Sequence, residues 1–404
     1  MLGNEEEAGS KQISSVNMVP RAFYEQEYCK EKIVSCIKFH PTKPHLVAMS
    51  LVENLDFNER TERMNKFHTN HVLILNFSDA HIITLNYILT TPVEITVIEF
   101  HPENPNILIG GALNGQVLAW DIASPEHRIN AGRKRQTVAK MPDEEEDKTQ
   151  QVAVKLKQLV LSNVDKSHRS YVADLQFIPG GVKVDKKHPN EGKSVHFLSC
   201  SEDGICLIWD TRAIDKNAMR EAREKAKNQK YDYEWVPWLA INLFRQDGSG
   251  EVGLSRVLFQ TGQETPTFFA SSDEGDLFMI DWAVKPIGED QKNAEHIRLT
   301  KDCERNYRPV VALERSPFFE ELIMTVHDFH FAIWKTQLDQ DTPIYRSANT
   351  FESHNTCGAF SPTRPGVIFI TKTNGIDVWD FVDQSNKPSL TLNIATNPIT
   401  TFKF

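Results

Sequence analysis

The chain has 404 residues, of which 40% are hydrophobic and 25% are charged, and its formal net charge is −10. This composition is ordinary for a globular protein with a sizeable core. The acidic balance disfavours nucleic acid as a partner, because a phosphate backbone binds clustered Lys and Arg. No apolar run reaches the roughly 20 residues that span a bilayer, so we expect no membrane partner.

The N-terminal region carries little pattern. Residues 1–19 have no periodicity, so we expect a disordered segment or an arm, and Arg21 to Val34 is aromatic and β-prone enough to hold one strand. The acidic start MLGNEEEAGSKQ lacks the basic and then apolar segments of a signal peptide. Six scattered cysteines form no CxxC pair, which is typical of reduced thiols in an intracellular protein.

From Phe39 onward a unit recurs along the chain. It consists of an apolar strand, a turn of small or polar residues, and a second apolar strand that often ends in Trp-Asp. The offset of 18 residues between Ser316 and Trp334 is repeated between Ser361 and Trp379. Such a spacing indicates a repeat architecture. The copies begin near residues 39, 100, 177, 257, 316, 361 and 398.

Turn residues support a hairpin in most copies. Asn114-Gly115 lies between two apolar runs and favours a type I′ turn, which needs positive φ at both central residues. The corresponding pairs are Asp203-Gly204, Glu274-Gly275 and Asn374-Gly375, and His327-Asp328-Phe329-His330 replaces the pair in the fifth copy.

The closing strands are apolar on nearly every residue, as in VLAW (117–120) and CLIW (206–209). Strands of this kind are covered on both faces, as in the blades of a radial array. Weaker candidates for a fourth strand are 82–89, 152–161, 235–243 and 389–394. The sequence therefore predicts an all-β propeller over 20–404 with about seven blades, the last of which has only its first strand and leaves an open edge.

Three insertions interrupt the repeat. Residues 130–151 place a basic patch before an acidic run and are expected to form a solvated loop, and 182–194 widens one hairpin. Residues 213–233 are rich in helix formers and predict a short inserted helix. Its apolar stripe is too narrow for a coiled coil.

No pattern of catalytic residues emerges. Gly192-Lys193-Ser194 resembles the end of a phosphate-binding loop, but residue 187 is a lysine where that loop needs its first glycine. His327 and His330, like His68 and His71, lack Cys or carboxylate partners at metal-ligand spacing. No Gly-x-Ser-x-Gly elbow is present. We therefore expect a protein that is no enzyme and that binds no cofactor or metal.

Several segments carry a resemblance to a known family. At Trp120-Asp121, Trp209-Asp210 and Trp379-Asp380 the chain resembles WD-repeat propellers. The runs RSPFFEELIMTVHDFHFAIWK and FSPTRPGVIFITKTNGIDVWDF, together with FHPENPNILIGGALNGQVLAWD and QEYCKEKIVSCIKFHP, are similar to axonemal dynein intermediate chains. Within that family the chain looks most like the intermediate chain of the two-headed inner arm (type f).

The resemblance implies a subunit of a motor complex in the cytoplasm and cytoskeleton, at the axoneme of a cilium or flagellum. One propeller face would hold the tail of a dynein heavy chain, and a second intermediate chain and axonemal docking proteins would be further partners. In the family, light chains bind a long N-terminal region, and only about twenty residues precede the first repeat here, so light-chain binding stays open. The alternative is a general WD-repeat adaptor in another intracellular assembly.

For partner contacts we predict the turns between the second and third strands, namely Asn114, Asp203, Glu274, Phe329, His330 and Asn374. Phe329 is the most informative, because the other copies have small polar residues there. Its ring either contacts a partner or packs against a neighbouring loop, and the sequence does not decide between the two.

Overall fold

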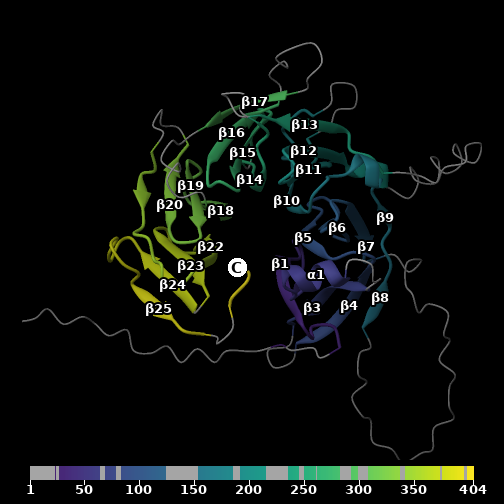
Figure 1. Ribbon diagram of the computed structural model, residues 1–404, viewed down its shortest axis with the longest axis horizontal. Helices are drawn as coiled ribbons and strands as arrows, with labels where there is room; N and C mark the ends of the chain where they lie inside the picture. Colours follow the sequence, from purple (N-terminus) through teal and green to yellow (C-terminus); the bar gives the residue numbers. More distant parts are fainter. Residues whose placement is uncertain are drawn as a thin grey trace, which may run out of the picture.

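The computed structural model describes residues 23, 27–63, 69–78, 83–123, 153–184, 192–214, 235–244, 250–260, 262–282, 293–298, 308–336, 342–373, 375–394 and 398–404. Their strands form six blades around a central axis, in sequence order (Figure 1). The predicted all-β propeller is thus confirmed, with six blades in place of about seven. Residues 1–19, 130–151 and Asn374 lie outside the described residues, as do 185–191 and 215–233 of the other two insertions.

Each blade is an antiparallel sheet whose first strand lies innermost. Blade 1 contains β1 (Lys32–Phe39), β2 (Leu46–Glu53), β3 (Asn70–Asn76) and β4 (Thr84–Thr91), and blade 2 contains β5 (Ile95–Phe100), β6 (Ile107–Ala112), β7 (Val117–Asp121) and β9 (Val160–Leu161). Blade 3 contains β10 (Val172–Phe177), β11 (His196–Ser201), β12 (Ile205–Asp210) and β13 (Leu239–Leu243). Blade 4 contains β14 (Leu254–Leu258), β15 (Thr267–Ser272), β16 (Leu277–Asp281) and β17 (Asn293–Arg298).

The last two blades have the same order. Blade 5 contains β18 (Val310–Arg315), β19 (Leu322–His327), β20 (Phe331–Lys335) and β21 (Tyr345–Arg346), and blade 6 contains β22 (Asn355–Phe360), β23 (Val367–Lys372), β24 (Gly375–Asp380) and β25 (Leu390–Leu392). Residues 398–404, predicted as the start of a seventh blade, belong to no sheet of the described chain.

Two outer strands join neighbouring blades. β8 (Val154–Leu156) pairs in parallel with β4 of blade 1, although the chain then continues into β9 of blade 2. β13 of blade 3 pairs in parallel with β17 of blade 4. The predicted single strand over 152–161 is therefore wrong, because this stretch divides between two blades.

The innermost strand of every blade carries a β-bulge at the same place. The bulged residues are Ser35, Thr96, Ala173, Ser255, Val311 and Thr356. A bulge moves one residue out of the ladder, and its side chain can then reach a neighbour. Ser35 Oγ donates to the carbonyl of Ile95 at 3.0 Å, and Thr96 Oγ1 donates to the carbonyl of Val172 at 2.6 Å. Each bond joins one blade to the bulge of the next.

The residue after the bulge makes a second contact between blades. Cys36 Sγ lies 3.8 Å from the carbonyl oxygen of Ile98, and the carboxylate of Asp174 accepts a hydrogen bond from the amide of Val257 at 3.0 Å. Arg256 donates to the carbonyl of Ala173 in blade 3 and to that of Val311 in blade 5, both at 3.1 Å. One arginine thus links three consecutive blades through the central region.

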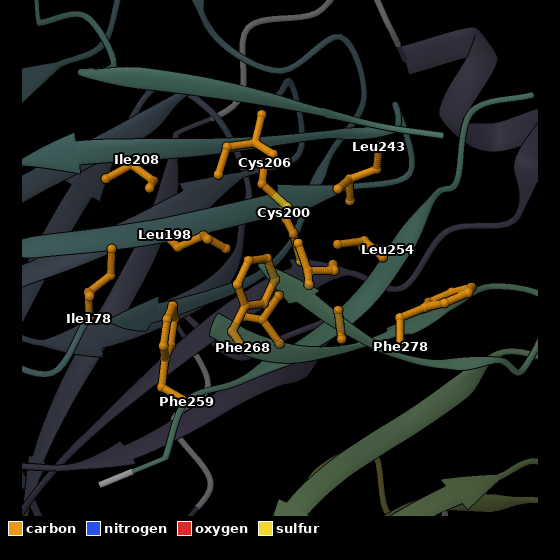
Figure 2. Packing of buried hydrophobic residues seen from close by; sticks show 14 of the residues in the cluster. Ile178, Leu198, Cys200, Cys206, Ile208, Leu243, Leu254, Phe259, Phe268 and Phe278 are labelled. Atoms are coloured by element: carbon orange, nitrogen blue, oxygen red, sulfur yellow. The ribbon is translucent and has the colours of Figure 1, made fainter. Parts of the chain in front are cut away.

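Apolar side chains fill the wedges between blades. Figure 2 shows this between blades 3 and 4, where Leu198, Cys200 and Cys206 pack with Leu254 and Phe268. Burial raises the pKa of the Cys200 thiol, which therefore stays protonated and packs as a small apolar group. The five cysteines that lie within the described ranges are free.

A series of buried hydrogen bonds holds the tryptophan at the end of the third strand of blade 3. Trp209 Nε1 donates to Ser199 Oγ at 2.9 Å, and Ser199 Oγ lies 2.8 Å from His168 Nε2. The other ring nitrogen of His168 lies 3.2 Å from a carboxylate oxygen of Asp203, which also accepts from the amide of Arg169. Blade strands, the turn and the connection between blades 2 and 3 are thereby held together.

The predicted hairpins form, but the Asn114-Gly115 turn is not of type I′. Between β6 and β7, Gly115 has φ +84, whereas Glu31 is the sole residue other than glycine with positive φ in the described chain. A Cβ at Gly115 would lie 2.2 Å from the carbonyl oxygen of His168. Both the backbone conformation and the close approach of the next loop require glycine here.

The helix observed in the structure is not the one that was predicted. α1 (Phe57–Arg63) lies in the connection between β2 and β3, where the sequence predicted no helix. The helix predicted over 213–233 falls almost wholly outside the described residues. Among the residues that the structure describes, no helix has the length and apolar character needed to cross a bilayer.

The tryptophan network of blade 3 leads to a stability prediction. Asp203→Ala removes the partner of a histidine whose side chain is 0% exposed, so we expect the free energy of unfolding to fall by about 1–3 kcal/mol. Urea denaturation monitored by tryptophan fluorescence measures this.

Glu274→Ala is the matched control, because it changes the equivalent, exposed turn position of blade 4. It should cost less than about 0.5 kcal/mol. Adding His168→Ala to Asp203→Ala should cost less than His168→Ala alone, and purely additive effects would show that the two side chains do not cooperate.

Candidate interaction face

The turns between the second and third strands of all blades lie on the same face of the propeller, because the blades share one strand order. We call this face of the propeller the turn face. Asn114 and Glu274 are exposed there, Phe329 is half-buried, and His330 is buried. The carboxylate of Asp203 is held in the network of Trp209 with a side-chain exposure of 4%. The predicted contact residues are therefore spread around the ring, and only some of them face solvent.

Asn114 caps its own turn. Its Nδ2 donates to Gln116 Oε1 at 2.7 Å, and its Oδ1 accepts from the amide of Gln116 at 3.2 Å. Both ends of the amide thus have local partners, which accounts for asparagine at this position without a partner protein.

Phe329 sits at the centre of an aromatic group on the turn face. Its ring centroid lies 5.3 Å from that of Phe351 and 4.8 Å from that of His354, both on the connection from blade 5 to blade 6. The guanidinium of Arg308 lies 5.4 Å from the ring centroid, within the range of a cation–π interaction. The ring therefore packs against a neighbouring loop and still keeps an exposed part.

His330 belongs to the interior of blade 5. Its ring stacks on that of His327 with a centroid distance of 4.3 Å and an interplanar angle of 7°. Burial, together with the nearby His327, lowers the pKa of His330 to about 3, and burial lowers the pKa of His327 to about 4. Both rings are therefore neutral at physiological pH, which allows them to stack without repulsion.

A cavity of about 370 Å³ opens beside Phe329, between blades 5 and 6. Phe331 and Trp379 supply further aromatic lining, and the walls also include Asn355, Lys372 and Asp377. Lys372 Nζ lies 2.5 Å from Asp377 Oδ2. The opposite charges of these two residues cancel each other in the lining. Thr391 Oγ1 donates to the other carboxylate oxygen at 2.8 Å.

Phe351 was missed by sequence reasoning. Its exposed fraction is 74%, the second highest among the large apolar side chains of the described residues. It follows no turn pair and lies in an irregular loop, so no periodic pattern marks it. An exposed aromatic side chain next to a partly exposed one is the arrangement that protein interfaces favour.

Blades 3 and 4 place acidic side chains together on the turn face. Burial, the charge of Glu202 and the charge of Glu274 raise the pKa of Asp273 to about 6. Glu202 also accepts a short hydrogen bond from the Tyr171 hydroxyl. The turn face is thus acidic at blades 3 and 4 and aromatic at blades 5 and 6.

Within the described ranges, no group of three or more His, Cys, Asp or Glu side chains is arranged to hold a metal ion. The cavity brings together aromatic rings, a neutralised ion pair and amides.

Comparison with known proteins shows which family the sequence matches. The sequence model described as the WD40 domain of dynein axonemal intermediate chain 3 matches residues 20–267 and 249–404. Dynein axonemal intermediate chain 3 of Danio rerio is 26% identical over 94% of this chain and 44% of its own length, and the Homo sapiens protein of that name is 24% identical over 92% and 48%. Dynein axonemal intermediate chain 2 of Mus musculus is 24% identical over 76% of this chain and 38% of its own length.

The chain spans about half the length of the intermediate chain 3 relatives, since the matched shares of those proteins are 44% and 48%. The region in common is the propeller.

The raised pKa of Asp273 leads to a pH prediction. Its ordinary value is 3.8 and its folded value is about 6, so the folded state binds more protons than the unfolded state between these values. The contribution of Asp273 to stability is therefore lost as pH rises through this window. Asp273→Asn should raise the melting temperature by a few degrees at pH 7, and the gain should shrink towards pH 4.

Asp383→Asn serves as the control, because Asp383 is exposed in the loop between β24 and β25. Its effect on the melting temperature should be small at every pH. If the gain from Asp273→Asn is the same at pH 4 and pH 7, the carboxylate is not the group that titrates.

Proposed function

The chain belongs to the WD40 family of axonemal dynein intermediate chains, and we propose that it is a non-catalytic scaffold of a ciliary inner-arm dynein. In this proposal the turn face holds the tail of a dynein heavy chain at the axoneme. A second intermediate chain, light chains and axonemal docking proteins are further proposed partners. The observation that carries the proposal is the family match, which extends over residues 20–404.

The geometry supports a binding role. The blades are joined to each other through backbone carbonyls, so the exposed turns can vary without loss of the ring. The turn face then offers Phe351 and Phe329 beside a cavity of about 370 Å³. A heavy-chain segment that places apolar or aromatic side chains against this pair would bury it from water, which is the usual source of affinity at an interface.

The charges of the turn face add to its specificity. Arg308 pairs with Asp328 at 3.6 Å and lies over Phe329, so this region holds a fixed cation beside the aromatic pair. The acidic group around Asp273 lies at blades 3 and 4. A partner that spans both regions would need a basic segment at one end and an apolar or acidic one at the other.

Phe351→Ala tests this proposal. Because the side chain is 74% exposed, its loss should hardly change the melting temperature. Association with a heavy-chain tail fragment should weaken about tenfold or more, as expected for an aromatic residue at the centre of an interface. Affinity is measured by titration of the purified chain with the tail fragment.

Val382→Ala is the control, since Val382 is 83% exposed and lies after β24, at the opposite end of the blade. It should leave the affinity unchanged. Weakening by Val382→Ala alone would place the heavy chain on the other face.

Phe329→Ala distinguishes the two roles of that ring. Binding to a partner predicts weaker association with the heavy-chain tail and a nearly unchanged melting temperature. A large loss of thermal stability would instead mean that contacts with Phe351 and His354 are the main role of the ring.

A further inference from the structure

The tryptophan at the end of the third strand makes the same hydrogen bond in blades 3 and 5. Trp209 Nε1 donates to Ser199 Oγ, and Trp334 Nε1 donates to Thr325 Oγ1, each at 2.9 Å. In both blades the acceptor lies on the second strand, two residues beyond the cross-strand partner of the tryptophan. The hydroxyl at this position therefore satisfies an indole N–H that is buried in the wedge towards the preceding blade.

Blade 6 lacks this hydroxyl. Trp379 pairs with Ile368, so the equivalent position is Ile370, whose side chain has no acceptor. Trp379 is only 6% exposed, and within the described ranges its Nε1 makes no hydrogen bond. The wedge between blades 5 and 6 thus contains a donor without an acceptor, which carries a cost for a buried group.

The loop that leads into blade 6 is also shorter than the loop that leads into blade 3. The two loops begin in the same way, since Ser162 Oγ accepts from the amide of Val117 at 2.8 Å and Ser347 Oγ accepts from that of Phe331 at 3.0 Å. From these serines, β10 begins ten residues later, at residue 172, and β22 begins eight residues later, at residue 355. The loop between blades 5 and 6 is therefore two residues shorter.

The ring of His168 has no counterpart in the shorter loop. The amide of His168 donates to the carbonyl of Gly115 at 3.2 Å, and the amide of Thr350 donates to the carbonyl of Phe329 at 2.8 Å, so Thr350 takes the place of His168. The hydroxyl of Thr350 turns back to the carbonyl of Phe329 at 3.3 Å. Thr350 and Trp379 both line the cavity of about 370 Å³. This cavity therefore lies where an imidazole ring packs in the wedge between blades 2 and 3.

The rest of the shorter loop does not supply the missing ring. Residues 347–355 all lie within the described ranges, and their two rings belong to Phe351 and His354. Both rings pack on Phe329, and neither lines the cavity. A ring that completes this wedge must therefore come from outside the loop.

The cavity also contains an acceptor without a donor. Asn355 is 4% exposed, and its Nδ2 donates to the carbonyl of His327 at 2.9 Å. Its Oδ1 has no hydrogen-bond partner among the residues that the structure describes. Phe331 and Trp379 supply aromatic walls. The lining thus offers an unpaired acceptor, an unpaired donor and aromatic surface.

We infer that this cavity binds the side chain of a tyrosine that a partner protein presents at the turn face. A phenol hydroxyl can both accept and donate, so it suits Trp379 Nε1 and Asn355 Oδ1, while its ring packs on the aromatic walls. A phenylalanine would leave both polar groups unpaired, and a carboxamide would leave the aromatic walls uncovered. The inference deepens the proposed function and rests on it for the identity of the partner.

Two small compounds test the chemistry of the site. N-acetyltyrosinamide and N-acetylphenylalaninamide differ only in the hydroxyl, and each is titrated into the ¹⁵N-labelled chain. We expect the tyrosine derivative to bind at least about threefold more tightly and to move the indole N–H resonance of Trp379 downfield, as a new hydrogen bond does. Trp379→Phe assigns this resonance. The indole N–H of Trp209 already donates to Ser199, so its resonance should not move.

Two variants of Ile370 provide the matched comparison. Ile370→Thr supplies the hydroxyl that Thr325 provides in blade 5, so the indole N–H of Trp379 should lie downfield without a ligand. The preference for the tyrosine derivative should then fall below about twofold. Ile370→Val removes one methylene without adding a hydroxyl, so the preference of at least about threefold should remain. The preference is a ratio of two affinities within one variant, and thermal melting confirms that each variant is folded during the titration.

Three results would overturn the inference. They are equal affinities for the two compounds, a full preference in Ile370→Thr, and a Trp379 N–H resonance that lies downfield in the free chain because another part of this chain fills the cavity. The test uses no heavy chain. Binding of N-acetyltyrosinamide without binding of the heavy-chain tail would refute the proposed function and keep this site, whereas the reverse would refute the site alone.

Discussion

The ring depends on polar side chains of the innermost strands that bond to backbone carbonyls of neighbouring blades. The hydroxyls of Ser35 and Thr96 donate to the carbonyls of Ile95 and Val172. Arg256 donates to the carbonyls of Ala173 and Val311. The acceptor is main chain, so the bond tolerates any residue at the accepting position. It also fixes the axial position of each blade, because a shift by one residue would turn the carbonyl away. Apolar packing in the wedges then adds stability to a geometry that these bonds have set.

The same constraint explains how much of the molecule follows from sequence. Hairpins are local, so apolar strands around Gly115 or Gly204 identify them, and strands covered on both faces indicate the radial array. Strands such as β8 and β21 have only three and two residues, too few to carry a period, and their pairing depends on distant chain. The steric need for glycine at position 115 depends on distant chain as well, because the carbonyl oxygen of His168 lies beside it.

The candidate site divides in the same way. Phe329 interrupts the pattern of small polar turn residues, so sequence alone marks its position. The role of Asp203 depends on His168 and Ser199, which lie 35 and 4 residues away, and only the folded chain brings the three together. Phe351 has no pattern at all, since it follows from how the loop between blades 5 and 6 packs. Sequence therefore locates the turn face, whereas tertiary packing determines which of its side chains face solvent.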